Sequence, residues 1–279
     1  MDNILTESLL IFGGSYSNLH ATQALKAWAD EHGFAADQII CTGDIIAYCA
    51  HPQETVDFIR NWLGDCNAAG QGRCIQGNVE QSLATQADDC GCGFEAGTTC
   101  DVLAKGWYDF AQSAINAQTR EWFSLLPETI SFTLAGKNVK IIHGAPSAVS
   151  RFMFASMDEV EFEKEFEQTN ADIIIAGHSG MPFTKQLSNG KVWHNSGALG
   201  MPANDGTSRV WFSVCNISNE GEIQFQHHAL TYDAEAASRQ MQDRGLTQAY
   251  DQTLLNGLWP SMDVLPEEET HNCGVALEM

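Results

Sequence analysis

Four polar residues that could bind a metal ion each stand at a turn that ends a short apolar run: Asp44, Asn78, His143 and His178. The apolar runs predict buried strands, so each residue is expected at the carboxyl end of a strand, where open α/β sheets gather their ligands. Together they supply one carboxylate, one amide oxygen and two imidazoles. This mixed oxygen and nitrogen set suits Zn²⁺, Mn²⁺ or Fe. The sequence therefore predicts a metal site.

Each of these residues also has an ordinary structural interpretation. Asp44 could cap the helix that follows it, and Gly77-Asn78 is a common turn dipeptide. A single histidine such as His143, at the end of an apolar strand before glycine, is usually a core or turn residue. The metal hypothesis therefore rests on the four residues taken together.

The segments that carry these residues alternate between predicted strands and helices. Apolar runs predict strands at 8–12 and 39–41, and helical spacing predicts helices that begin near residues 19 and 52. Further strands are expected at 130–134, 139–143, 171–176, 183–187, 192–196, 209–217 and 224–229, the last four forming a largely antiparallel portion. Alternation of this kind predicts a layered α/β fold with sites at strand ends.

Two other regions have a different character. Residues 84–127 are expected to form a helical insertion in a domain that spans 1–232, and residues 233–279 a C-terminal helix and acidic tail without a catalytic role. The insertion contains Cys90, Cys92 and Cys100. Because this pattern lacks the paired C-x-x-C spacing of zinc sites, we expect free or locally paired thiols and no zinc there.

The composition restricts the classes of partner. The chain has 36 acidic and 14 basic residues and a formal charge of −22, which disfavours nucleic acid and anionic membranes. No apolar run approaches the ~20 residues of a membrane span, and the first residues lack the pattern of a signal peptide. We therefore expect a cytoplasmic protein whose nine cysteines are mostly reduced thiols. The sequence gives no indication of the oligomeric state.

The order of these motifs resembles the calcineurin-like metallophosphoesterase superfamily, which is known by D-x-H, G-D, G-N-H-[DE], H-G and G-H-x-H. The second to fifth motifs correspond here to Gly43-Asp44, Gly77-Asn78 with Glu80 at the acidic position, His143-Gly144 and Gly177-His178. The late segment 195–200 resembles the N-P-G-S-x-G turn of the family. The resemblance spans about residues 8–217 and implies a four-layer α/β/β/α sandwich of two mixed sheets flanked by helices.

The chain also departs from the family pattern at specific positions. Gly14 and Tyr16 replace the Asp and His of the first motif, Val79 replaces the His of the third, and Gly180 replaces the last His of the fifth. In the family, most of these positions serve one of two metal ions, whereas the other ion uses the four residues that this chain retains. The resemblance therefore implies a single ion of Mn, Fe or Zn, with Tyr16 as an extra ligand if the metal is ferric.

The function implied by the resemblance is that of an atypical phosphoesterase, which hydrolyses a small phosphomonoester or phosphodiester through a metal-activated water. Val79 replaces the usual proton donor, so Glu80 and Tyr16 are the candidate catalytic residues, although Glu80 could instead be a helix N-terminal carboxylate. Arg151 could contact a phosphate, and His194 could reach the vacated metal position. The alternatives are a surface ion pair for Arg151 and a structural hydrogen bond for His194.

Two further classes of function stay open. The chain could be a non-catalytic relative that binds a metal or a phosphorylated ligand as a sensor or scaffold, or the cysteine-containing insertion could have a redox role. Metal content together with turnover of generic phosphoesters would indicate the enzyme, and metal without turnover would indicate the binding protein.

Overall fold

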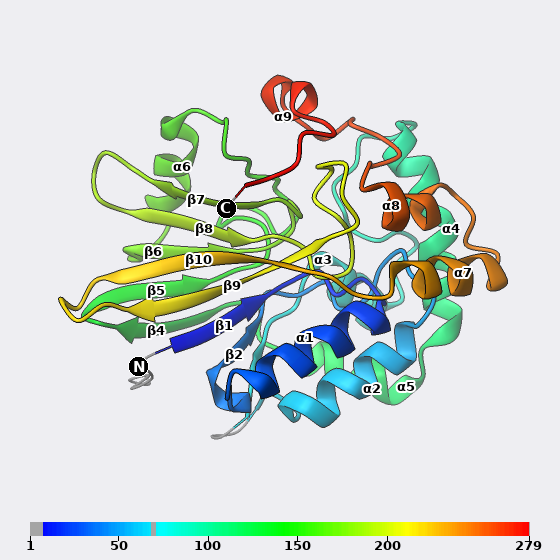
Figure 1. The fold of residues 1–279 in the computed structure, drawn as a ribbon, viewed down its shortest axis with the longest axis horizontal. Helices are drawn as coiled ribbons and strands as arrows, with labels where there is room; N and C mark the ends of the chain where they lie inside the picture. The colour runs from blue at the N-terminus through cyan, green and yellow to red at the C-terminus, as the bar shows by residue number, and fades with distance from the viewer. Residues whose placement is uncertain (1–7, 68–70, 279) are drawn as a thin grey trace.

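Two five-stranded mixed sheets form the centre of the molecule in the computed structural model, which describes residues 8–67 and 71–278 (Figure 1). The first sheet has the order β10-β9-β1-β2-β3, and its strands are β1 (Ser8–Phe12), β2 (Ile39–Cys41), β3 (Arg73–Cys74), β9 (Val210–Ile217) and β10 (Ile223–Leu230). The second has the order β4-β5-β6-β8-β7, and its strands are β4 (Ile130–Leu134), β5 (Lys137–Ile141), β6 (Ile173–Ala176), β7 (Pro182–Gln186) and β8 (Val192–Ser196).

Both sheets are mixed: the second has antiparallel pairs at both edges, whereas the first is antiparallel at its β10 edge and parallel at its β3 edge. Strand β1 is parallel to β2 and antiparallel to β9, while β6 is parallel to both β5 and β8. The four late strands that the sequence predicts as one antiparallel portion are divided between the sheets. Strands β7 and β8 belong to the second sheet, and β9 and β10 to the first.

The apolar run of β1 is continuous because both of its faces are buried. Leu9 and Ile11 pack between the two sheets, against residues of β5 and β6 that include Ile141. Leu10 and Phe12 point to the opposite face and pack against helices. Successive residues of one strand therefore belong to two different hydrophobic layers.

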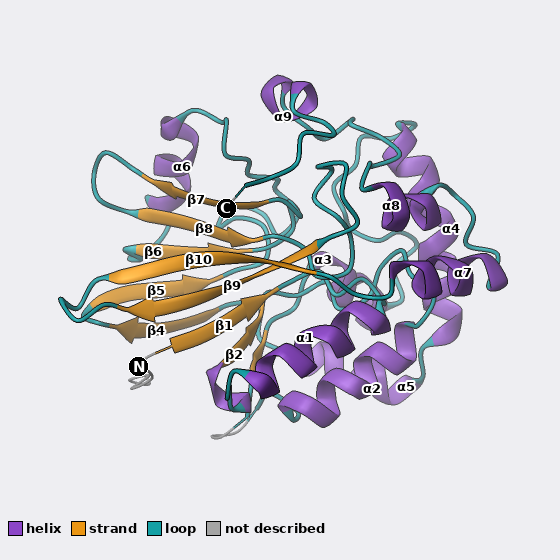
Figure 2. Ribbon diagram, in the orientation of Figure 1, coloured by secondary structure: helices purple, strands orange, loops and turns teal. Residues whose placement is uncertain are grey.

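Helices cover the outer face of each sheet (Figure 2). On the first sheet lie α1 (Leu19–Glu31) and α2 (Pro52–Leu63), whose apolar residues join the same core as β1. On the second lies α6 (Glu159–Phe166), where Phe162 and Phe166 pack edge-on against Trp193 with ring centroids 5.4 and 6.1 Å away. This arrangement confirms the four-layer α/β/β/α sandwich that the sequence predicts.

The region between β3 and β4 is helical, as the sequence predicts. It contains α3 (Asn78–Thr85), α4 (Thr99–Ala114) and α5 (Ala117–Leu125). The side chain of Thr98 caps α4 and that of Asn116 caps α5, each by accepting a backbone N–H three residues later. None of the helices in residues 8–67 and 71–278 has the length and apolar character needed to cross a bilayer.

The C-terminal region is more extensive than the single helix and tail that the sequence predicts. It contains α7 (Ala234–Asp243), α8 (Tyr250–Asn256) and α9 (Glu267–His271). The segment between α8 and α9 is attached to the sandwich, since Trp259 donates its backbone N–H to Asn204 Oδ1 at 2.8 Å and its Nε1–H to the Pro202 carbonyl at 2.7 Å. This region is therefore part of the packed structure.

One close backbone approach determines how the ends of β2 and β3 meet. Gly43 has a φ of +92°, and a Cβ atom built on it would lie 2.5 Å from the backbone nitrogen of Gly77. Only glycine fits such a contact. The approach places the next residue along each turn, Asp44 and Asn78, beside one another.

Gly43→Ala should lower the free energy of unfolding by about 2 to 5 kcal/mol, because the methyl group adds a backbone overlap to the strain of a left-handed conformation. Gly33→Ala is the matched control, since Gly33 also has a positive φ but no atom of the described residues lies within 4 Å of the place its methyl group would take. We expect the control to lose about 1 to 2 kcal/mol. Urea unfolding followed by circular dichroism measures both values, and equal losses would contradict the proposed overlap.

Candidate metal centre

The four residues predicted as metal ligands converge at the edge where the two sheets meet. Asp44 follows β2 and Asn78 begins α3 directly after β3, so both come from the first sheet. His143 follows β5 and His178 follows β6, so both come from the second. Each sheet thus contributes two side chains from the carboxyl ends of neighbouring parallel strands.

The Nε2 atom of His143 lies at the centre of this group. It is 3.1 Å from Asp44 Oδ2, 3.1 Å from Asn78 Oδ1 and 3.2 Å from His178 Nδ1. Ligand atoms bound to one tetrahedral zinc-sized ion at about 2.1 Å would be separated by about 3.4 Å. The observed spacing is therefore close to that of a coordination shell. The ligand atoms of Asp44, His143 and His178 all lie within 4.8 Å of one another.

The hydrogen bonds behind these side chains orient their lone pairs towards one another. The Nδ1 atom of His143 lies 2.7 Å from the Thr42 carbonyl oxygen, so Nδ1 donates, and Nε2 carries the proton shared with Asp44 or, once that proton is displaced, a lone pair for a cation. The Nδ2 group of Asn78 donates to the Cys90 carbonyl at 2.9 Å, which leaves Oδ1 facing the site. The oxygen atoms of Asp44 and Asn78 thus face Nε2 of His143, with Nδ1 of His178 beside them, and a single proton on Nε2 cannot satisfy all three contacts. The donor set fits a bound cation.

The charges of the site favour the same interpretation. Burial alone would raise the pKa of Asp44, but the charge and hydrogen bond of His143 and the charge of His178 outweigh it and lower this pKa. Burial alone would lower the pKa of His143, but Asp44 raises it. Burial, together with the charge of His143, lowers the pKa of His178 to about 3. The site therefore holds an ionised carboxylate and a neutral imidazole, with one proton on the His143–Asp44 pair that an incoming cation would displace.

Two of the candidate ligands have strained backbones. Asp44 has a φ of +53° and His178 a φ of +61°, in the left-handed region that residues with a Cβ seldom occupy. Such residues are found preferentially at active sites and ligand sites, where the surrounding structure imposes the conformation.

Glu80 lies behind the centre and not in it. Its Oε2 accepts the backbone N–H groups of Asp44 at 2.7 Å and Gly77 at 2.8 Å, and its Oε1 accepts that of Ile45 at 2.9 Å. Burial, with a contribution from the charge of Asp44, raises the pKa of Glu80 to about 7. That pKa would suit a proton donor, but both oxygens are already used by backbone donors. In this structure Glu80 therefore positions the turn that carries Asp44.

Arg151 and His194 also lie outside the centre. Arg151 forms ion pairs with Glu161 at 2.7 Å and with the buried Glu165 at 2.8 Å. His194 is fully buried in β8, where Nδ1 lies 2.8 Å from Thr184 Oγ1 and Nε2 lies 2.7 Å from Ser213 Oγ. These contacts are the ion pair and the structural hydrogen bond that were the alternatives to substrate binding.

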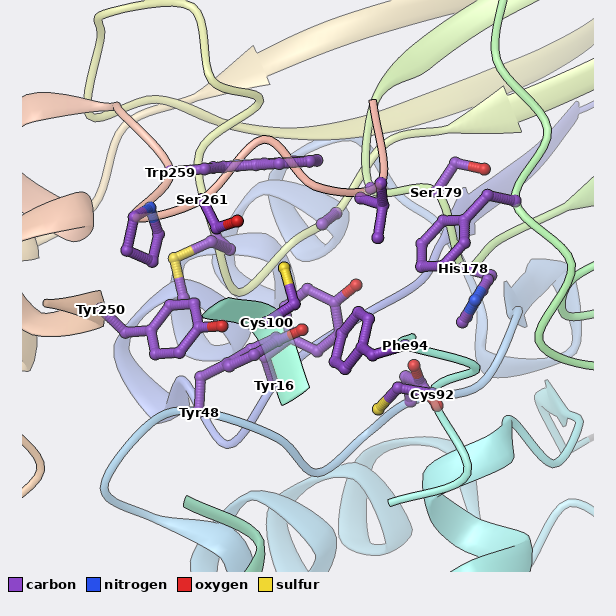
Figure 3. Close-up of a pocket in the computed structure, with 17 residues that line it drawn as sticks. Tyr16, Tyr48, Cys92, Phe94, Cys100, His178, Ser179, Tyr250, Trp259 and Ser261 are labelled. Carbon is purple, nitrogen blue, oxygen red and sulfur yellow. The ribbon is translucent and has the colours of Figure 1, made fainter. Parts of the chain in front are cut away.

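Aromatic rings lie beside both positions where glycine replaces a ligand of the family, but only the ring beside Gly14 would overlap an added side chain. A Cβ atom on Gly14 would lie 2.6 Å from Cζ of Tyr16, and one on Gly180 would lie 3.5 Å from Cζ2 of Trp259. Tyr16 and Trp259 line a cavity of about 70 Å³ that also reaches Asp44 and His178 (Figure 3). Burial, followed by the charge of Asp44, raises the pKa of Tyr16, so its phenol is protonated at neutral pH.

Most residues of the cavity wall belong to no motif that the sequence reveals. Tyr48 stands within the stretch that contains Asp44, but Tyr250 and Trp259 come from the C-terminal region, where no motif draws attention to them.

The cysteines of the insertion follow one of the alternatives left open, since Cys90 and Cys92 form a disulfide while Cys100 is a free thiol.

Glu80→Gln should destabilise the protein by about 1 to 3 kcal/mol, because the new amide nitrogen cannot accept a hydrogen bond and leaves at least one buried N–H without a partner. The exposed Glu121→Gln is the matched control and should change stability little. Thermal and urea unfolding provide the measurement. Unchanged stability together with a large loss of turnover would instead indicate that Glu80 transfers a proton.

Comparison with known proteins identifies the family. The model of the calcineurin-like phosphoesterase superfamily domain matches residues 14–219, which is more than half of the chain. An uncharacterised protein from Methanocaldococcus jannaschii is 24% identical over 243 residues, which cover 82% of this chain and 89% of that protein. Among solved structures, a metallophosphoesterase from Sphaerobacter thermophilus has a TM-score of 0.67 at 18% identity, covering 91% of this chain and all of that one. A hypothetical protein from Pyrococcus horikoshii has a TM-score of 0.72 at 14% identity, covering 90% and 98%. These two structures share the fold, and the family match shows that the chain belongs to the calcineurin-like phosphoesterase superfamily.

Proposed function

We propose that this protein is a metal-dependent phosphoesterase that acts with a single ion of Mn, Fe or Zn, bound by Asp44, Asn78, His143 and His178. The observation that supports the proposal is the group of three polar side-chain atoms around His143 Nε2, whose contacts a single shared proton cannot all satisfy. When bound, such an ion polarises a phosphoryl oxygen and lowers the pKa of a coordinated water. The substrate would be a small phosphomonoester or phosphodiester.

The residues around the centre would orient the phosphate and exclude bulk water. Asp44 is the only carboxylate that lines the cavity among the described residues, so one divalent ion would leave a local positive charge in an otherwise acidic protein. Glu80 and the Gly43–Gly77 contact would hold Asp44 in place. The formal charge of −22 favours a small phosphorylated substrate over nucleic acid. The proposed compartment is the cytoplasm.

A second ion would find few ligands. Gly14 and Gly180 supply no side chain, so a second ion would share Asp44 with the first ion and would be repelled by it.

Isothermal titration with Mn²⁺ should therefore give a stoichiometry of one, and Asp44→Asn should abolish binding. His32→Gln, at an exposed histidine outside the site, is the control and should bind normally. Two tight sites in the unmodified protein would show that other residues, Tyr16 foremost, act as ligands.

Metal affinity should fall as the pH falls. The pKa of His143 is raised by Asp44, and below that pKa the ion must displace a proton from the pair, whereas above it no proton competes. Titrations at about pH 6 and about pH 8, in buffers of different ionisation enthalpy, should show weaker binding and more proton release at the lower pH. An affinity that is independent of pH would contradict the role of His143.

Turnover of generic phosphoesters should depend on the same residues. Asp44→Asn and His178→Gln should each lower kcat/KM by about 1000-fold, since a catalytic ion supplies several kcal/mol of transition-state stabilisation. The matched control is again His32→Gln, which should retain activity. Tight metal binding without any turnover would support the alternative, a relative that acts as a sensor or scaffold.

A further inference from the structure

The cavity beside the candidate metal centre has walls made largely of aromatic rings (Figure 3). The six rings that line it belong to Tyr16, Tyr48, Phe94, Phe152, Tyr250 and Trp259. They come from four distant parts of the chain, including the C-terminal region. The aromatic surface therefore extends directly from the candidate ligands Asp44 and His178, which line the same cavity.

These rings are held in place before any ligand binds. Trp259 is held through its backbone N–H by Asn204 and through its indole Nε1–H by the carbonyl of Pro202. The Tyr48 ring lies 4.5 Å from that of Tyr250, centroid to centroid, and the Phe152 ring lies 4.2 Å from that of His178. A flat ring that entered the cavity would meet preformed aromatic walls, so their ordering would cost little.

The same cavity has few charged groups that could recognise a charged leaving group. Among its described lining residues there is no Lys or Arg, and the only carboxylate and imidazole are those of Asp44 and His178. A leaving group that carried its own phosphate or carboxylate would therefore find no cationic side chain among these residues. An alkoxide leaving group would find no free carboxylic acid or imidazolium to protonate it, whereas a phenol has a pKa of about 10 and departs as an anion.

The size of the cavity limits the leaving group as well. Its volume is about 70 Å³, and it opens to the surface. A fully enclosed site for benzene measures about 150 Å³, so a single ring here would lie partly in the mouth of the cavity. The enclosed part of the cavity therefore accommodates at most one ring.

We infer that the substrate of this site is a phosphate monoester of a small, uncharged aromatic alcohol, whose ring lies against the walls formed by Trp259, Tyr250 and Phe152. This inference rests on the proposed function. In the reaction, the oxygen of water forms a bond to phosphorus and the bond between phosphorus and the aryl oxygen breaks. Its electron pair stays on the aryl oxygen, which leaves as a phenolate, and the two protons of the water stay on the phosphate until they exchange with solvent.

Binding of two phosphonates to the Mn²⁺-supplemented protein tests this inference without requiring turnover. Phenylphosphonate and cyclohexylphosphonate have the same charge and similar bulk, but only the first has a flat aromatic ring. By isothermal titration we expect phenylphosphonate to bind about tenfold more tightly. Trp259→Leu should reduce this preference to about twofold, whereas Leu258→Ala, at the exposed neighbour that does not line the cavity, should retain it.

The outcomes separate this inference from the proposed function. Equal binding of the two phosphonates, no binding of either, or a preference that Trp259→Leu leaves unchanged would overturn the inference, whatever the turnover. A ring preference without hydrolysis of phenyl phosphate would support the inference about the cavity while the phosphoesterase proposal fails. Equal hydrolysis of phenyl and cyclohexyl phosphate would support the phosphoesterase and overturn the aromatic substrate. The comparison of ligands on the unmodified protein does not depend on how the variant folds.

Discussion

A single hydrogen bond between the two sheets organises the candidate centre. The Nδ1 atom of His143, at the end of β5, lies 2.7 Å from the carbonyl of Thr42, which follows β2 in the other sheet. This hydrogen bond fixes the orientation of the imidazole and directs its Nε2 atom towards the carboxylate of Asp44. The packing of the sheets and the chemistry of the site are thus coupled, because a shift of one sheet against the other would turn the ring away.

Two features hold the turns around this hydrogen bond in place. Gly43 permits the close approach of the two turns, and the carboxylate of Glu80 accepts backbone N–H groups from both of them. A buried carboxylate with several backbone donors is costly to remove, because each orphaned donor carries its own desolvation penalty. The strained φ of Asp44 is sustained by this support and would relax without it.

The sequence was sufficient for the parts of the molecule that local pattern determines. Buried strands that end in Gly-Asp, Gly-Asn, or His beside Gly predicted both the layered fold and the convergence of Asp44, Asn78, His143 and His178. Contacts set by tertiary packing were not predictable in this way. The partners of His194 come from the neighbouring strand and from the other sheet, and Trp259 is positioned by residues more than fifty positions earlier in the chain.

The contact between Gly14 and the ring of Tyr16 also constrains the order in which this protein could change. An aspartate at position 14 tolerates the left-handed backbone there better than most residues, but its Cβ would collide with the phenol. A carboxylate at position 14 is therefore acceptable only where the ring of Tyr16 turns aside into the cavity or has been replaced. The two positions are coupled, so the order of their changes decides whether the cavity wall must rearrange.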